Sequence, residues 1–328
     1  MKKIALGVSI IILISILSFF TILFFTPKPL FAAIKAIPVE ANLTKPSNYS
    51  EIEENISVRK NITYSNEYLE SSLDIYSPKK LKESAPVILF IHGGGFFKGE
   101  KEMAKYFGPT LSNEEYIFVS INYNLAPNAT VFDQIKQVNE AIKFIVENAE
   151  QFSINKNEIN LAGSSAGGFL ALQLLSAYHD DSYAKKIEIQ PVKNTLFKSL
   201  LLYSTVFDLS EFQNFDGNIL SNYVVSKIGW GLTGEKNWKQ DKHLGQLLNL
   251  NNYISEKFPP IFITDGNTDT FTKQAKSYVA RLEEFKVPTQ TLFFDSKVEV
   301  GHGYQLNMES HASEKAVAQS LEFLKLNQ

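Results

Sequence analysis

Short apolar runs alternate with segments of helical period along most of the chain, and this order limits the possible folds. The clearest run is 87–91, which is apolar at every position and ends at His92. Such a run is typical of a strand buried on both faces of a sheet. Similar runs predict further strands at 116–122, 159–162, 200–203, 261–264 and 289–294.

Helices are expected between these strands. In 132–148, Ile135, Val138, Ile142 and Ile145 recur close to a 3.6-residue period. The repeated strand-then-helix order predicts an α/β fold with a mainly parallel sheet and helices on both faces. The other expected elements are helices at 165–178, 272–285 and 312–326, and an antiparallel strand pair at 55–64 and 68–76.

The main domain is expected to span 51–328, with a cap inserted at about 209–258. The inserted stretch has no clear strand pattern, and it holds both tryptophans of the chain, Trp230 and Trp238. Its aromatic content favours a folded cap over the sheet rather than a disordered insertion.

The first residues predict a membrane anchor. Lys2 and Lys3 precede an uncharged run, Ile4–Phe25, which would span roughly 33 Å as a helix. We therefore expect a signal anchor over 1–27 and a proline-containing tether over 28–50. The positive-inside rule places the catalytic domain outside a cell membrane crossed once. Cleavage near the small residues at 32–33 would instead release a secreted form.

Composition excludes several classes of function. The net charge is −3, from 32 basic and 35 acidic residues, which gives no reason to expect nucleic-acid binding. Cysteine is absent, so thiol catalysis, disulfides, iron–sulfur clusters and Cys-ligated zinc are excluded.

A G-x-S-x-G pattern at 163–167 lies directly between an expected strand and an expected helix. This is the context of a nucleophile elbow, a turn so sharp that the residues beside the serine must be small. Ser165 Oγ would stand above the strand end, at the N-terminus of the following helix, where backbone N–H groups stabilise negative charge. The alternative is a glycine- and serine-rich turn without chemistry.

A second motif, His92-Gly93-Gly94-Gly95, follows the strongest strand. Acyl transfer creates an oxyanion that needs preplaced N–H donors, and successive glycines let the backbone present them. No Lys-[Ser/Thr] pair follows, so a phosphate-binding loop is not supported.

Two late loops complete a candidate catalytic set. Asp269 lies in a turn after the strand 261–264, and His302 lies between glycines after the strand 289–294. The order Ser165, Asp269, His302 is the one found in α/β hydrolases. His302 would be the base for the serine, and Asp269 would orient it.

Other candidates are weaker. Asp265 ends its strand and is the main alternative carboxylate, and Asp208 is a remote third choice. Only His302 among the histidines sits in a glycine-flanked loop after the last strand; the others are His92, His179, His243 and His311.

These motifs resemble the α/β-hydrolase superfamily, and within it the esterase/lipase group related to hormone-sensitive lipase. The resemblance rests on 92–95, on 163–168, which matches G-[DES]-S-A-G-G, and on 122–127, which is similar to N-Y-R-L-A-P. It covers about 67–328 and implies the fold and a Ser–Asp–His triad. It also implies an oxyanion hole from the N–H groups of Gly94, Gly95 and Ala166.

The chain departs from that group at three positions. Asn124 replaces an arginine, Ser164 replaces an acidic residue, and Gln137 stands where an acidic residue is expected. Because the first and last are partners in the group, their joint neutrality is consistent, and none of the three belongs to the triad.

The expected function is a serine carboxylesterase that cleaves short- to medium-chain esters through an acyl-enzyme and needs no cofactor or metal. Its expected partners are a small-molecule ester and, through the N-terminal helix, a membrane; the sequence leaves oligomeric state open. The alternatives are an acetyl-sugar esterase, an arylformamidase or a peptidase on the same fold, and an inactive scaffold module.

Overall fold

The structure, a computed structural model, describes residues 21, 24–38, 42–81 and 83–328. Most of the expected anchor, 1–27, lies outside these residues. Among the described residues, no helix has the length and apolar character needed to cross a membrane.

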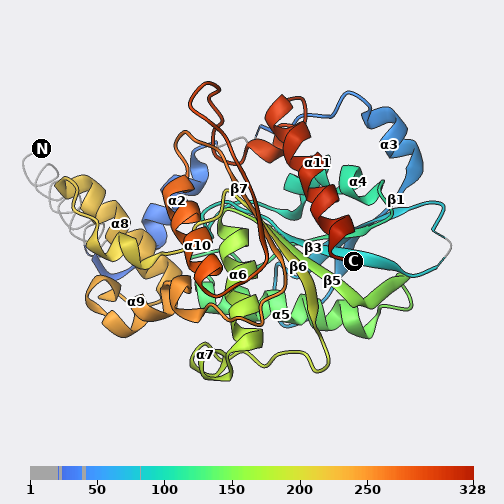
Figure 1. Ribbon diagram of the computed structural model, residues 1–328. Coiled ribbons are helices and arrows are strands. Elements are labelled where there is room, and N and C mark those ends of the chain that lie inside the picture. Colours follow the sequence, from blue (N-terminus) through green and yellow to red (C-terminus); the bar gives the residue numbers. More distant parts are fainter. Residues whose placement is uncertain (1–20, 22–23, 39–41, 82) are drawn as a thin grey trace, which may run out of the picture.

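Within the described residues, the strands form one eight-stranded sheet in the order β1-β2-β4-β3-β5-β6-β7-β8 (Figure 1). The pairs β1–β2 and β2–β4 are antiparallel, and the remaining neighbours are parallel. The mainly parallel sheet and its antiparallel start are thus confirmed. The strands are β1 (Ile56–Thr63), β2 (Ser72–Pro78), β3 (Ala85–Ile91), β4 (Ile117–Ile121), β5 (Ile154–Ser164), β6 (Phe197–Tyr203), β7 (Ile261–Asp265) and β8 (Thr289–Phe293).

Helices cover both faces of the sheet, as the strand-then-helix order predicts. The α-helices are α2 (Lys28–Ala36), α3 (Tyr49–Asn55), α4 (Phe107–Ser112), α5 (Val131–Glu147), α6 (Ala166–His179), α7 (Asp181–Lys186), α8 (Ile219–Thr233), α9 (Lys242–Leu248), α10 (Thr272–Glu284) and α11 (His311–Leu326). Single 3₁₀ turns are η1 (Lys101–Ala104), η2 (Ser210–Asn214), η3 (Trp238–Gln240), η4 (Leu250–Tyr253) and η5 (Tyr304–Leu306).

The central strands are apolar on both faces because each face is covered. In β3, Leu89 and Ile91 join one core with α5, α6 and α10, whereas Ile88 and Phe90 join a second core with α4 and α11. This split follows from the two-residue repeat of a strand, which turns successive side chains to opposite faces. The continuous apolar run that predicted β3 therefore reflects two separate cores.

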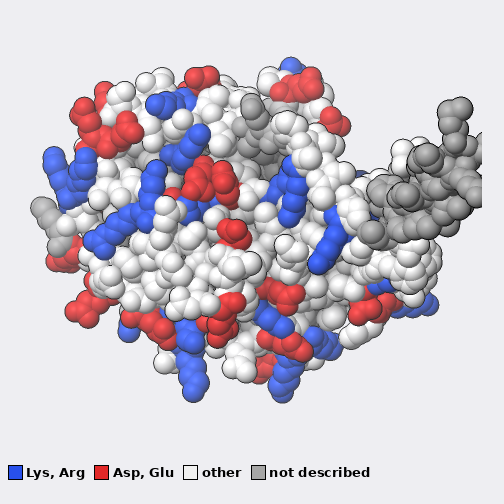
Figure 2. All heavy atoms as spheres, turned by 180° about the vertical axis from the view of Figure 1, so that it is seen from behind, with Lys and Arg blue, Asp and Glu red and all other residues white. Residues whose placement is uncertain are grey.

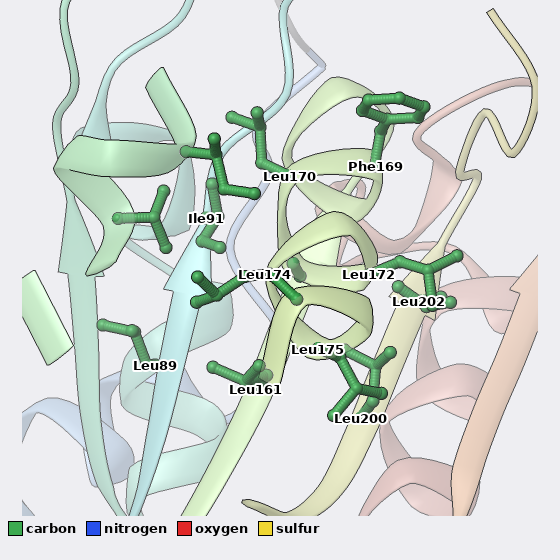
Figure 3. Close-up of a cluster of buried hydrophobic side chains, with 14 of the residues drawn as sticks. Leu89, Ile91, Leu161, Phe169, Leu170, Leu172, Leu174, Leu175, Leu200 and Leu202 are labelled. Carbon is green, nitrogen blue, oxygen red and sulfur yellow. The ribbon is translucent and has the colours of Figure 1, made fainter. Parts of the chain in front are cut away.

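Helix α6 is buried against the central strands of the sheet. Figure 3 shows its leucines and Phe169 among the side chains of β3, β5 and β6. Nearly every residue of α6 is buried, so the helix that begins at Ser165 is fixed against the three central strands. Packing of this density limits how far the residue at its N-terminus can move.

The inserted stretch is a helical cap. It consists of η2, α8, η3, α9 and η4, and it contains no strand among its residues, all of which are described. It lies to one side of the sheet, with α8 and α9 at that edge of the molecule (Figure 1).

The structure differs from the expected tether over 28–36. These residues form α2, whose Phe31 is 1% exposed and packs against Phe97 and Gly231. Burial of a phenylalanine outweighs the proline content of the stretch, because fully burying such a side chain contributes about 1.5–3 kcal/mol. This part of the expected tether is therefore packed on the cap.

Surface charge is mixed. On the face seen in Figure 2, the basic and acidic side chains of the described residues are interspersed. Such a face does not steer ligands of one charge by a long-range field.

A buried ion pair holds the segment after the His92 loop. Lys101 Nζ lies 3.1 Å from Asp74 Oδ1, and both side chains are almost fully buried. The Lys101 backbone is held as well, because its N–H donates to Asn122 Oδ1 and its carbonyl accepts from Ser120 Oγ. Lys101 therefore fixes the downstream end of the glycine loop to β2 and β4.

Removal of one partner of this pair should be costly. We expect Lys101→Met to lower the free energy of unfolding by about 3–5 kcal/mol, because the buried Asp74 loses its ionic partner and, among the described residues, keeps a hydrogen bond only from the Asn61 N–H. Urea denaturation would measure this. The double substitution Lys101→Met/Asp74→Leu should recover most of the loss, and an equally unstable double variant would contradict the explanation.

Candidate active site

Ser165 occupies a sharp turn between β5 and α6. Its backbone has φ 53° and ψ −118°, in a region that residues with a side chain rarely adopt. The Ser165 N–H donates to the Tyr203 carbonyl at 2.8 Å, and the Ser165 carbonyl accepts from Phe169 N–H. These bonds hold the serine above the carboxyl end of the sheet, as the G-x-S-x-G pattern predicts.

Close contacts with neighbouring atoms require the residues around Ser165 to be small. A Cβ at Gly163 would meet the Gly167 carbonyl, and one at Gly167 would meet the Ile91 and His92 carbonyls. A Cβ at Gly168 would meet the Thr205 side chain. The turn therefore depends on backbone-to-backbone approach that only glycine allows.

The His92 loop passes beside this turn. Gly94 has φ 117° and Gly95 has φ 62°, and a Cβ at Gly93 would lie 2.8 Å from the Ser164 carbonyl oxygen. Within the described part of the chain, no acceptor takes a hydrogen bond from the N–H groups of Gly94, Gly95 or Ala166. These three N–H groups, expected from the sequence as oxyanion donors, are thus free to bind a ligand oxygen.

His92 supports the loop from inside. Its ring is 1% exposed and stacks on Tyr123, with centroids 4.4 Å apart. Its Nδ1 lies 2.7 Å from the Gly93 carbonyl, and Tyr123 donates to the His92 carbonyl. Burial lowers the pKa of His92 to about 4, so the ring is neutral at pH 7 and Nδ1–H donates to Gly93.

His302 meets Ser165. Its Nε2 lies 2.9 Å from Ser165 Oγ, and its Nδ1 lies 3.2 Å from Thr270 Oγ1. Because the Thr270 hydroxyl donates to Asp265, its oxygen accepts from Nδ1–H. This leaves Nε2 without a proton, which is the tautomer that can accept the hydroxyl proton of Ser165.

The carboxylates are arranged differently from the predicted direct pair. Asp269 is exposed in a left-handed conformation with φ 49°, and no hydrogen bond joins it to His302. Asp265 is fully buried and reaches His302 only through Thr270. Thr270 was not predicted from the sequence, because no motif marks it and only its position after Asp269 relates it to the site.

Burial sets the protonation of both groups. His302 lies at the rim, yet the protein atoms packed around its ring lower its pKa below the usual 6.5. The imidazole is therefore free base at neutral pH. Burial raises the pKa of Asp265, against hydrogen bonds from Thr270, Ser204 and Gly266 that lower it.

Two further contacts hold the histidine loop against the ends of β5 and β6. Gln305 Nε2 donates to Ser164 Oγ at 2.8 Å, and Gly303 N–H donates to Ser204 Oγ at 3.1 Å. Ser164, the neutral departure from the family pattern, is therefore bound by a neutral amide. Neither Gln305 nor Ser204 belongs to a motif from which its contact could be predicted.

The other two departures contact each other. The Asn124 N–H donates to Gln137 Oε1 at 2.9 Å, and Asn124 Oδ1 accepts from Glu70 N–H. The neutral pair thus connects the segment after β4 to α5.

An apolar pocket of about 240 Å³ opens at Ser165. Its floor includes Gly95 and Ala166, and the cap closes it from the other side. The lining is almost entirely apolar; the cap contributes Leu209, Phe212, Val225, Ile228, Gly229, Leu232, Thr233, Trp238 and Leu248. Such a pocket suits a hydrocarbon group attached to the carbonyl that Ser165 would attack.

Metal chemistry has no evident centre here. Among the described residues, no group of three or more histidine, cysteine or acidic side chains is arranged to hold an ion.

Comparison with known proteins gives one family and many relatives. The family model described as BD-FAE matches residues 73–282. The chain is 26% identical over 250 residues to a protein of Arabidopsis thaliana named probable isoprenylcysteine alpha-carbonyl methylesterase ICMEL2, covering 72% of this chain and 58% of that protein. It is 28% identical over 156 residues to neutral cholesterol ester hydrolase 1 of Bos taurus, covering 46% and 37% of the two chains.

The chain therefore spans less than two thirds of the length of these curated relatives. Among solved structures, esterase B from Lactobacillus rhamnosis is similar, with a TM-score of 0.72 and 20% identity, covering 83% of this chain and 86% of that one. That likeness shows the fold.

The strained backbone conformation of Ser165 should lower the free energy of unfolding of the protein. A residue with a side chain is strained in this region by about 1–3 kcal/mol. Glycine avoids this strain but lowers the free energy of unfolding by about 0.4–1 kcal/mol, because its unfolded chain has more conformational freedom. We therefore expect the free energy of unfolding of Ser165→Gly, measured by urea denaturation, to exceed that of Ser165→Ala by up to about 2 kcal/mol. Both variants lose the His302 contact, so the alanine variant is the matched control. Equal stabilities would show that the turn stores no strain.

Proposed function

We propose that this chain is a serine carboxylesterase for short- to medium-chain acyl esters. The chain belongs to the BD-FAE family of α/β-hydrolase esterases. The observation that carries the proposal is the contact between His302 Nε2 and Ser165 Oγ at the mouth of an apolar pocket. Free N–H groups at Gly94, Gly95 and Ala166 support it.

The first half-reaction transfers the acyl group to Ser165. As Ser165 Oγ bonds to the ester carbonyl carbon, its proton moves to His302 Nε2 and the carbonyl oxygen becomes an oxyanion. The free N–H groups would stabilise that charge, each contributing about 2.7–4 kcal/mol to the transition state. Collapse breaks the bond to the alcohol oxygen, which takes the proton from His302 and leaves.

The second half-reaction releases the acid. A water molecule attacks the acyl carbon while His302 Nε2 takes its proton. The second oxyanion collapses, the bond to Ser165 Oγ breaks, and that oxygen recovers the proton. Because the pKa of His302 is lowered, the base is present at neutral pH at the start of each step.

Asp269 is our proposed partner of the His302 imidazolium. Its side chain is exposed, its backbone is left-handed, and it lies directly before Thr270 in the same turn. Strained residues of this kind cluster at functional sites, and catalytic hydrogen bonds often tighten only when substrate binds. Thr270 and Asp265 would then hold the turn in place.

The pocket volume sets the acyl length. A 150 Å³ apolar cavity binds benzene, so about 240 Å³ accommodates roughly ten carbon atoms. The volume includes the space over Ser165, so the optimum should lie below that limit.

We also propose that the N-terminal apolar run anchors the enzyme in a cell membrane with the catalytic domain outside the cytoplasm. The support is the length of Ile4–Phe25 and the lysines that precede it.

A series of p-nitrophenyl esters tests the activity. We expect the full chain in detergent to hydrolyse acetate through octanoate, with kcat/KM falling beyond about ten carbons as the pocket fills. Ser165→Ala should lose about 10⁶-fold in kcat, and a fluorophosphonate should label only the wild type. A wild type that is neither active nor labelled would contradict the esterase assignment.

Paired asparagine variants test the carboxylate. We expect Asp269→Asn to lower kcat by about 10⁴-fold, because His302 loses the group that orients and stabilises its charged form. Asp265→Asn should mainly lower stability, since it removes a buried hydrogen-bond acceptor from Thr270 and Gly266. The reverse result, with Asp269→Asn near wild type, would assign the role to Asp265 acting through Thr270.

A further inference from the structure

Helix α8 has two apolar faces. Val225, Ile228 and Leu232 line the pocket, and at about 100° per residue they fall on one side of the helix. Leu220 and Tyr223 fall on the opposite side by the same spacing. The helix is thus apolar on the side that faces the substrate and on the side that faces away from it.

The outward side is exposed. Ile219 is 92% exposed and Leu220 is 71% exposed, and Tyr223 next to them is exposed as well. A helix that is apolar all round is usually buried in a core or a membrane. Contiguous exposed apolar side chains, unlike scattered ones, mark an interaction surface. We call the surface formed by the exposed Ile219, Leu220 and Tyr223, together with the half-buried Trp230 beside them, the outer face of α8.

The end of the N-terminal apolar run lies on the same helix. Lys227 Nζ donates to the Phe24 carbonyl at 3.4 Å, and Lys236 Nζ lies 3.8 Å from the centre of the Phe24 ring. Phe24 and Phe25 are themselves mostly exposed. The last residues of an apolar run long enough to span a bilayer therefore lie beside the outer face.

This position places the outer face at a lipid boundary. A membrane segment ends at the bilayer surface, where the interfacial layer is about 5–8 Å thick on each side. Leu220 lies seven residues before Lys227, or about 10 Å along the helix axis. Because this distance exceeds the thickness of the layer, Leu220 reaches the layer when α8 runs along the bilayer surface and not along the bilayer normal.

The side chains around it are those found at bilayer interfaces. Lys227 Nζ lies over the rings of Trp230 and Tyr223, at 4.5 Å and 5.6 Å from their centres. Lys236 lies over Trp230 and Phe25. Tryptophan and tyrosine are enriched at the headgroup level, and the exposed Lys236 can reach toward the phosphates while its stem stays in apolar surroundings, whereas Lys227 is buried against Trp230.

We propose that the outer face of α8 rests in the interfacial layer of a lipid bilayer, so that esters dissolved in the bilayer enter the pocket along the other face of the same helix. The proposal rests on the esterase activity proposed above, and it names bilayer-partitioned acyl esters as the substrate class. An anchor alone would hold the enzyme near a membrane in any orientation, whereas this contact fixes the pocket on the inner side of α8, one helix away from the lipid.

Quenching of Trp230 tests the contact directly. The full chain carrying Trp238→Phe is reconstituted into phosphatidylcholine vesicles with bromine at positions 6 and 7 of one acyl chain. We expect at least a twofold loss of Trp230 fluorescence relative to unbrominated vesicles. Adding Ile219→Gln and Leu220→Gln should restore most of it, because the apolar contact area is removed. An unquenched Trp230, or quenching unchanged by these two substitutions, would overturn the proposal.

Substrate selection gives an independent readout. Ile219→Gln/Leu220→Gln should reduce hydrolysis of a p-nitrophenyl decanoate dissolved in vesicles by about fivefold or more, and leave soluble p-nitrophenyl acetate unchanged. The matched control is Leu196→Gln, since Leu196 is 75% exposed and lies in the loop before β6, outside the cap. An equal loss in the control would refute a role for α8.

Two other outcomes are separable. If the wild type hydrolyses neither ester, the proposed esterase function fails, whereas Trp230 quenching still reports on the bilayer contact. If Trp230 is shielded without quenching and the chain sediments as a dimer in detergent, a second copy covers the outer face and the bilayer proposal is overturned.

Discussion

The close approach of backbones at Gly163, Gly167 and the carbonyl of Ile91 is the constraint on which the site depends. It lets α6 begin immediately at the end of β5, so that Ser165 is held in a strained turn by a helix buried against three strands. The same approach brings the His92 loop within contact of the elbow. One steric condition therefore fixes both the nucleophile and its expected oxyanion donors, and the stability lost there is supplied by the core beneath.

The histidine loop is positioned by hydrogen bonds to neutral side chains, two of which, Thr270 and Ser204, also bond to the buried Asp265. Gln305 binds Ser164 next to the nucleophile, and Ser204 binds Gly303 next to His302. A buried charged pair at these places would lose solvation that its mutual attraction does not always restore. Neutral partners keep the site apolar, which is consistent with the lowered pKa of His302 and with a pocket lined by hydrocarbon.

Most of the fold could be predicted from the sequence because buried parallel strands and amphipathic helices leave strong periodic patterns, as in β3 and α5. The elbow and the glycine loop were also predictable, since their residues are fixed by steric needs that few sequences meet. Thr270 was not, because its contact with His302 depends on the path of a turn between two strands. Helix α2 was missed because it is stabilised by tertiary contacts of Phe31, with Phe97 and with Gly231 of the cap, which leave no pattern in the sequence.

The cap shows why an insertion can carry specificity that the rest of the fold does not. Its inner residues close the acyl pocket, and Trp238 packs where a Cβ at Gly229 would clash, so α8 and η3 are locked together. Phe31 of α2 in turn packs against Gly231 of α8, which connects the N-terminal segment to the wall of the pocket. Helix α8 is therefore in close contact with η3 through Gly229 and with α2 through Gly231, so that α2 packs directly on a helix that lines the pocket.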